Sequence, residues 1–167
     1  MTISLGICDF LDRHINDSKI KWPNDIYVKN DKIAGILIEN SIMEDTIENS
    51  VAGVGLNINQ EKFPPDIPNP VSLKLLTGGK YDTGSCLKEM LSDIDKRYKQ
   101  LLYGDRNKLH CEYINRLYRF DEFHIYRTAE REFAGKITDV SFSGLLIIED
   151  ESGKIREFLF REIDFVL

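Results

Sequence analysis

Apolar residues in the first part of the chain follow first a helical and then a strand-like spacing. Leu5, Cys8, Leu11 and Ile15 recur with the period of an α-helix, which predicts a helix over residues 4–15. Short apolar runs separated by turn-forming Asn, Asp and Pro residues then predict strands, the second and third of them joined as a hairpin. These strands are expected at residues 20–22, 26–28, 33–38 and 51–58, and the last is expected to be buried.

The middle of the chain combines a proline-rich stretch with a second helical pattern. Prolines cluster between residues 60 and 70, which predicts an irregular loop. Asp82 or Thr83 can then cap a long helix, because apolar residues follow at helical spacing. Those residues are Leu87, Met90, Leu91, Ile94, Tyr98, Leu101 and Leu102, and a shorter helical pattern covers residues 109–117.

From about residue 120 the pattern changes to short strands with tight turns between them. Ser143–Gly144 and Ser152–Gly153 suit such turns. Antiparallel strands this short protect their edges by curling, so we predict a small β-barrel at residues 120–167 after a first domain at residues 1–119. The strands are expected at residues 123–126, 133–140, 145–148, 155–160 and 165–166.

Composition argues against several functional classes. The 167-residue chain has a formal charge of −6 and a pI near 5.1, which argues against a general nucleic-acid binder, so no DNA partner is expected. No apolar run is long enough for a membrane helix and no signal-like N-terminus is present, so we expect a cytoplasmic protein without membrane association. Cys8, Cys86 and Cys111 are widely spaced, so neither a disulfide framework nor a protein-bound metal is expected.

The segment Lys21-Trp22-Pro23-Asn24-Asp25 has the highest density of chemically capable groups. Lys21 lies on an otherwise apolar strand, where it can bind a phosphate or carboxylate and stabilise negative charge in a transition state. Equally, it can be a lysine whose stem lies along a strand edge beside a packing tryptophan. Asn24 and Asp25 can bind ligand hydroxyls or orient Lys21, or they can form the turn through bonds to the backbone.

One apolar run contains Gly53, Gly55 and Asn57. Glycine weakens a strand unless something approaches the backbone closely, so this pattern favours a nearby ligand. Asn57 and Asn59 need hydrogen-bonding partners, which a nucleotide base or ribose can provide. The G-x-G is followed by neither a third glycine nor a helix, so the dinucleotide-binding motif is not met. Gly35 has two explanations as well, close approach of a ligand or tight packing against the helix.

Three segments together resemble, in their order and spacing, the motifs of biotin protein ligases. They are K-W-P-N-D at residues 21–25, K-x-x-G-I-L-x-E at residues 32–39 and G-x-G-x-N-x-N at residues 53–59. The resemblance continues through residues 69–73, the long helix and the C-terminal strands. It implies an α+β fold with a partial mixed β-sheet and helices on one face, as in class II aminoacyl-tRNA synthetases and biotin ligases, followed by a small SH3-like β-barrel.

The resemblance also implies a two-step reaction with ATP, with Mg²⁺ carried by its phosphates, and with biotin as substrate. Biotin's carboxylate would attack the α-phosphate to form biotinoyl-5′-AMP, and a lysine of a biotin carboxyl carrier protein or domain would then accept the biotinoyl group. Lys21 would be the catalytic lysine, in contact with the biotin carboxylate and the α-phosphate, and Gly35 would line the biotin pocket. The adenylate-binding residues would be Asn57, Asn24, Trp22 and Asp25.

In the resembled family, a loop of the form G-R-G-R-x-G-R-x-W and residues that hold biotin's ureido ring precede K-W-P-N-D, and neither is found in this sequence. We therefore expect the C-terminal part of a ligase, with residues 1–119 a truncated catalytic domain of low activity in isolation. Uncovered strands would expose apolar surface, so a homodimer or low solubility is expected. No DNA-binding segment is seen either, so repressor activity is not expected.

Two alternatives stay open beside the ligase. The chain can be a non-catalytic ligase remnant that acts as an interaction module through its β module or its open sheet edge, in which case it would bind neither biotin nor ATP. It can also be a lipoate ligase-like acyltransferase of the related fold, which would act on a lipoyl-domain acceptor.

Overall fold

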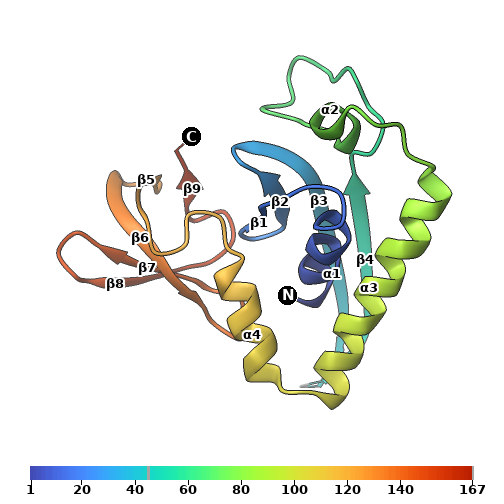
Figure 1. Ribbon diagram of the computed structural model, residues 1–167. Helices are drawn as coiled ribbons and strands as arrows, with labels where there is room; N and C mark the ends of the chain where they lie inside the picture. Colours follow the sequence, from blue (N-terminus) through green and yellow to red (C-terminus); the bar gives the residue numbers. More distant parts are fainter. Residues whose placement is uncertain (45, 167) are drawn as a thin grey trace.

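The computed structural model describes residues 1–44 and 46–166, which form two sheets flanked by helices (Figure 1). The helices are α1 (Thr2–Leu11), α2 (Leu73–Thr77), α3 (Thr83–Tyr103) and α4 (Arg106–Asn115). The first sheet contains β1 (Ser18–Lys21), β2 (Asp25–Val28), β3 (Asp31–Met43) and β4 (Thr46–Leu56). The second sheet contains β5 (Phe123–Arg127), β6 (Glu132–Val140), β7 (Leu146–Asp150), β8 (Ile155–Phe158) and β9 (Asp164–Phe165).

The first sheet has the strand order β1-β2-β3-β4, and all its ladders are antiparallel. The mixed sheet that the resemblance implies is therefore wrong for the described residues, because short turns join successive strands and such turns connect only antiparallel neighbours. The predicted first helix is confirmed as α1, which buries Leu5, Phe10 and Leu11 and contacts β1, β2 and α3. The α+β class is confirmed as well.

The long predicted helix is confirmed as α3, with Asp82 as its cap. The Asp82 carboxylate accepts a hydrogen bond from the Ser85 N–H at 2.8 Å, which satisfies one free donor of the first turn. Arg97 on α3 donates to Asp9 of α1 at 2.6 Å and also pairs with Glu112 of α4, so one guanidinium ties three helices together. Within residues 1–44 and 46–166, no helix is both long enough and apolar enough to cross a membrane.

The irregular loop predicted between β4 and the long helix folds back onto β3. The Lys32 N–H donates to the Asn69 carbonyl at 2.8 Å, and the Lys32 carbonyl accepts from the Val71 N–H at 2.9 Å. Ser72 then caps α2, a short helix that the sequence analysis did not predict. These bonds keep the proline-rich loop beside the glycine-bearing parts of β3 and β4.

The second sheet has the strand order β8-β7-β6-β5-β9 and confirms the short strands predicted after residue 120. Gly144 and Gly153 take left-handed φ values of 93° and 79° at the predicted turns. Tyr126, Ile137 and Leu146 are fully buried in its core. The predicted SH3-like barrel is not confirmed, because β8 and β9 are the edges of an open sheet in the described part of the chain.

The predicted burial of the glycine-bearing strand is wrong for most of β4. Val51 is 66% exposed and Leu37 on β3 is 64% exposed. The reason is that β4 lies at the edge of the described sheet, while Gly53 and Gly55 carry no side chains to cover the neighbouring face. The apolar exposure expected on these strands is observed.

Candidate functional site

A cavity of about 600 Å³ lies between the first sheet and the loop that follows β4. Its lining brings together four of the six residues that the resemblance assigns to the site, and the loop adds apolar side chains from Phe63 and Ile67. A hollow of this size that combines apolar walls with a few polar groups is typical of small-molecule sites. The four selected residues are Lys21, Asp25, Gly35 and Asn57.

Among the described residues, no carboxylate forms an ion pair with the Lys21 ammonium group. Lys21 ends β1 directly opposite Asp25, yet no ion pair or hydrogen bond joins its Nζ to residues 1–44 or 46–166. Its Nζ instead lies 5.2 Å from the ring centroid of Tyr27 and 4.7 Å from that of Phe165. Burial lowers the pKa of Lys21, and the nearby Asp25 carboxylate partly offsets this effect. An anionic ligand would therefore meet a positive charge that no described carboxylate contacts directly.

Asp25 is engaged by Lys32, whose Nζ lies 2.6 Å from the carboxylate oxygen Oδ1. This ion pair explains why Asp25, although it lies opposite Lys21, does not form an ion pair with it. Gly35 lies against the pair, because a Cβ at this position would come within 3.4 Å of the Lys32 Nζ and 3.5 Å of the Asp25 Oδ1. A Cβ at position 35 would therefore make ordinary contacts with the ion pair and would take up space in the cavity.

Gly55 lines the cavity on β4, and Gly53 lies two positions before it on the same face of the strand. The β3–β4 register pairs Gly35 with Gly55 and Leu37 with Gly53. A Cβ would meet nothing closer than 3.8 Å at Gly53 and 4.0 Å at Gly55, so the packing of the chain does not require glycine at either position. A ligand lying against the backbone would require it. Leu37 and Val51 continue this face as exposed apolar residues, so the floor suits an apolar ring system.

The two asparagines after β4 have different surroundings. Asn57 lines the cavity and donates from Nδ2 to the Val71 carbonyl at 3.1 Å. Asn59 uses both ends of its amide on Tyr81, donating to the carbonyl at 2.7 Å and accepting from the N–H at 3.0 Å. Asn59 therefore ties the loop to the segment before α3, whereas the Oδ1 of Asn57 is available to a donor on a ligand.

Trp22 and Asn24 do not line the cavity. Trp22 is buried and donates from Nε1 to the Gly144 carbonyl of the second sheet at 3.0 Å. Asn24 donates from Nδ2 to the Ile36 carbonyl at 2.8 Å, and its own carbonyl accepts from the Ile36 N–H at 2.8 Å. Both residues fix the turn after β1 and thereby the position of Lys21, while their direct contacts with a nucleotide stay a prediction.

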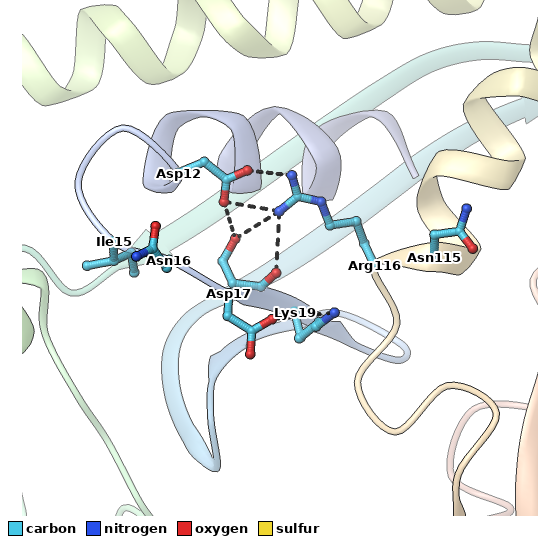
Figure 2. A pocket seen from close by; sticks show the side chains of 8 residues that line it. Asp12, Ile15, Asn16, Asp17, Lys19, Asn115 and Arg116 are labelled. Carbon is cyan, nitrogen blue, oxygen red and sulfur yellow. Dashed lines mark hydrogen bonds and ion pairs between the residues drawn. The ribbon is translucent and has the colours of Figure 1, made fainter.

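A second cavity, of about 400 Å³, lies where the end of α1 meets the start of β1 and the end of α4 (Figure 2). Arg116 donates to both carboxylate oxygens of Asp12, and the Ser18 hydroxyl donates to the same carboxylate at 3.1 Å. Figure 2 shows how these bonds join the three elements. The main charged groups around this cavity bond one another, and these bonds stabilise the junction of the three elements. The cavity is therefore a weaker candidate for anion binding than the one beside Lys21.

Residues 2–57 match the Biotin/lipoate A/B protein ligase family. The bifunctional ligase/repressor BirA of Bacillus spizizenii is 28% identical over 137 residues, and the biotin-(acetyl-CoA-carboxylase) ligase of Paracoccus denitrificans is 30% identical over 141 residues. The chain is related to biotin protein ligases. These matches include 80% and 81% of the chain but 42% and 58% of the two relatives, so the chain spans about half of their length.

The fold of this ligase relative is also found in solved ligase structures. The biotin protein ligase from Aquifex aeolicus in complex with biotin and ATP superposes with a TM-score of 0.77, and the match covers 98% of this chain and 68% of that chain. The two sequences are 23% identical, so this likeness concerns the fold.

Several residues around Lys21 in this ligase relative were not selected from the sequence. Tyr27 was detectable, because it lies two positions from Asp25 on a strand and therefore faces the same side. Lys32 stands in the second motif, but its pairing with Asp25 depends on the hairpin register. Phe165 carried no such signal, because its contact with Lys21 arises from the packing of one sheet against the other.

Proposed function

We propose that this chain carries the catalytic lysine and the biotin-binding floor of a biotin protein ligase. In the first step a biotin carboxylate oxygen attacks the α-phosphorus of ATP, pyrophosphate leaves and biotinoyl-5′-AMP forms. In the second step the neutral ε-amine of a carrier lysine attacks the acyl carbon, AMP leaves and the amine releases a proton. The observation that carries the proposal is the Lys21 ammonium on the wall of a glycine-floored cavity, where no residue of the described chain forms an ion pair with it.

The charge of Lys21 serves both steps, because negative charge accumulates on the phosphate and carboxyl oxygens in each transition state. A fixed cation in a partly desolvated site stabilises that charge without acting as a nucleophile. Since burial lowers the pKa of Lys21, its charge is lost at a lower pH than that of an ordinary lysine. The rate should therefore fall on the alkaline side before an unperturbed lysine would titrate.

The cavity floor supports biotin as the activated acid. Gly35 and Gly55 leave the backbone bare, which suits the flat fused rings of biotin, and Phe63 adds an apolar wall. Asn57 would face the adenylate. Trp22, Asn24 and Asp25 keep their place in the proposal as residues of the nucleotide loop, and their role in positioning Lys21 is supported by their hydrogen bonds and ion pair.

The residues present do not form a Mg²⁺ site on their own. Asp25 is the one carboxylate on the described cavity wall, and it is already bonded to Lys32. The described residues also contain no group of three side chains that could hold a metal ion. Mg²⁺ therefore enters the proposal as part of the Mg²⁺-ATP substrate, bound to the phosphates.

The proposed partner is a biotin carboxyl carrier protein or domain. This is supported by the name of the Paracoccus relative, which refers to acetyl-CoA carboxylase, and by the biotin and ATP in the Aquifex complex. A homodimer is a further proposal, supported by the exposed apolar residues of β3 and β4. Residues 1–119 and 120–167 are proposed as two domains, the second an SH3-like module.

The test follows both chemical steps with a chain shown to be folded by near-UV circular dichroism. Biotin-dependent exchange of pyrophosphate into ATP reports the first step, and the intact mass of a carrier domain reports the second. Lys21→Ala should abolish both signals. Lys19→Ala is the matched control, because Lys19 lies on the same strand but pairs with Asp17 at 3.5 Å, and it should leave both signals intact.

Exchange that survives in Lys21→Ala would contradict the assigned role of that residue. Pyrophosphate exchange that depends on lipoate and not on biotin, together with lipoyl transfer to a lipoyl domain, would assign the chain to the lipoate ligases. The matched family includes these as well. If calorimetric titrations showed that the folded chain binds neither biotin nor ATP, the proposal would be overturned in favour of a non-catalytic interaction module.

A further inference from the structure

The ammonium of Lys21 lies between two aromatic rings that come from different sheets. Tyr27 belongs to β2 and its ring centroid is 5.2 Å from Nζ, whereas Phe165 belongs to β9 and its centroid is 4.7 Å away. Both distances lie within the roughly 6 Å at which a ring face attracts a cation. The described residues that line the cavity all precede residue 71, so Phe165 does not line the cavity itself and contacts the site through Lys21.

The backbone around Phe165 is fixed from two sides. Tyr126 of β5 pairs with Phe165 of β9 in an antiparallel ladder. The next carbonyl, that of Val166, accepts a hydrogen bond from Arg119 Nη1 at 2.9 Å. A short terminal strand would otherwise fray, so these bonds give the Phe165 side chain a defined origin.

The Phe165 ring is also fixed by neighbouring rings. The Tyr126 ring meets it in a T-shaped contact with centroids 5.3 Å apart, and the Tyr118 ring stacks on it at 6.4 Å. Tyr118 in turn lies 5.3 Å from Tyr27, the second ring beside the ammonium. Because the ring is already ordered by packing, holding a cation costs it little further conformational entropy.

Lys21 has few other constraints on where its charge lies. Asp25, opposite it in the ladder, bonds Lys32 at 2.6 Å. At longer range Asp25 and Asp164 favour the charged lysine, whereas Lys32 and Arg119 disfavour it. A lysine stem has several rotatable bonds, so without an ion pair the ammonium needs some other contact to occupy one place.

We propose that Phe165 is a positioning residue of the site, whose ring holds the Lys21 ammonium against Tyr27 through a cation–π contact. The second sheet thereby sets where the catalytic charge lies. The inference deepens the proposed function and rests on the role assigned there to Lys21. The hydrogen bond from Trp22 to Gly144 acts in the same direction, because it fixes the residue next to Lys21 to the same sheet.

The test observes Lys21 itself in the full chain. Lysines are ¹³C-methylated, the Lys21 resonance is assigned by its loss in Lys21→Arg, and its pKa is read from an NMR pH titration. Phe165→Leu keeps the apolar bulk and removes the ring, so the Lys21 pKa should fall by about half a pH unit, a roughly threefold loss in proton affinity. Phe165→Trp restores an aromatic face and should restore the pKa.

Phe158→Leu is the matched control. Phe158 lies in the same sheet and stacks on Phe133 with centroids 5.9 Å apart, and no described contact joins it to Lys21. A purely structural role for Phe165 predicts that both leucine variants lose stability while the Lys21 pKa stays constant. That result would overturn the inference.

The kinetic test separates this inference from the proposed function. In the exchange assay Phe165→Leu should lower kcat about tenfold with little change in KM for biotin, since the ring affects charge placement rather than the biotin floor. A wild-type chain without exchange, but with the expected pKa response, contradicts the ligase proposal and supports the Phe165–Lys21 contact. Full exchange in Phe165→Leu with an unchanged pKa contradicts the contact alone.

Discussion

The two sheets carry glycine within their strands for opposite physical reasons. In β6 of the second sheet, a Cβ at Gly135 would lie 2.6 Å from Cγ2 of Ile148 and 3.1 Å from the Glu149 carbonyl oxygen. In β4 of the first sheet, a Cβ at Gly55 would meet nothing closer than 4.0 Å. Glycine in the second sheet therefore makes room for the core, whereas glycine in the first leaves the backbone open to a ligand.

Apolar side chains show the same contrast between the sheets. Ile148 in the second sheet is fully buried, whereas Leu37 and Val51 in the first sheet are largely exposed. The strands of both sheets contain β-branched and aliphatic residues, so the presence of such residues does not separate the sheets. The two sheets differ in whether other side chains of the protein cover a given face. The candidate site lies on the uncovered face of the first sheet.

The largest expected effect comes from removing core volume in the second sheet. Ile148→Ala should lower the free energy of unfolding by about 2–5 kcal/mol, because a fully buried side chain leaves a cavity. Leu37→Ala, the exposed counterpart, should change it by less than about 0.5 kcal/mol. Urea unfolding followed by Trp22 fluorescence measures both. Both variants are compared at a protein concentration low enough to keep the chain monomeric, where equal losses would mean that Leu37 is covered within the chain. A loss at Leu37 that grows with protein concentration would instead support the proposed homodimer through this face.

The glycine contrast can be tested by adding one methyl group to each sheet. Gly135→Ala pushes its Cβ into Ile148 and the Glu149 carbonyl, and should cost about 1–3 kcal/mol in unfolding free energy. Gly55→Ala should stay within about 0.5 kcal/mol of the parent, since its Cβ has space. Its biotin affinity, measured by calorimetry, should nevertheless fall about tenfold, or about 1.4 kcal/mol. Unchanged biotin binding in Gly55→Ala would remove β4 from the site.

Sequence patterns predict the elements of both sheets but not which face is bare. The helical period and the Asp82 cap predict α3, and Ser-Gly pairs predict the turns at Gly144 and Gly153, because these signals are local. The burial of β4 was predicted wrongly, since an apolar run does not say which neighbour covers it. The antiparallel hairpin of β2 and β3 was predicted from its turn, whereas the antiparallel order of the whole sheet was missed because the resemblance suggested a mixed sheet.

The same limit applies to the candidate site. The motifs select Lys21, Gly35 and Asn57, which the fold brings to one cavity. An asparagine in a turn looks the same in sequence whether its amide bonds a ligand or its own backbone, so the hydrogen bond from Asn24 to Ile36 could not be foreseen. The contact of Phe165 with Lys21 depends on how two sheets dock, which no spacing reports.

A smaller effect is expected at the hydrogen bond that joins the two sheets. Trp22→Phe removes the Nε1 donor to the Gly144 carbonyl and should cost about 1 kcal/mol, the net value of one partly buried hydrogen bond. Hydrogen exchange should speed up in the turn between β6 and β7 and leave the core of α3 unchanged. Exchange that rises equally everywhere would indicate global destabilisation and would contradict a local bond between the sheets.

The smallest effect distinguishes the ion pairs of the two sheets. Arg127 Nη2 lies 2.6 Å from Glu132 Oε1 across β5 and β6, and these two side chains are 56% and 51% exposed. The side chains of Lys32 and Asp25 in the first sheet are only 38% and 18% exposed. Glu132→Gln should cost about 0.3 kcal/mol at low ionic strength and nothing measurable in 1 M NaCl, because salt screens an exposed pair. The loss in Asp25→Asn should persist in 1 M NaCl, because a less exposed pair is screened less. If salt erased both losses equally, the Asp25–Lys32 pair would be as open to solvent as a surface pair, and it would no longer explain why Lys21 keeps a free charge.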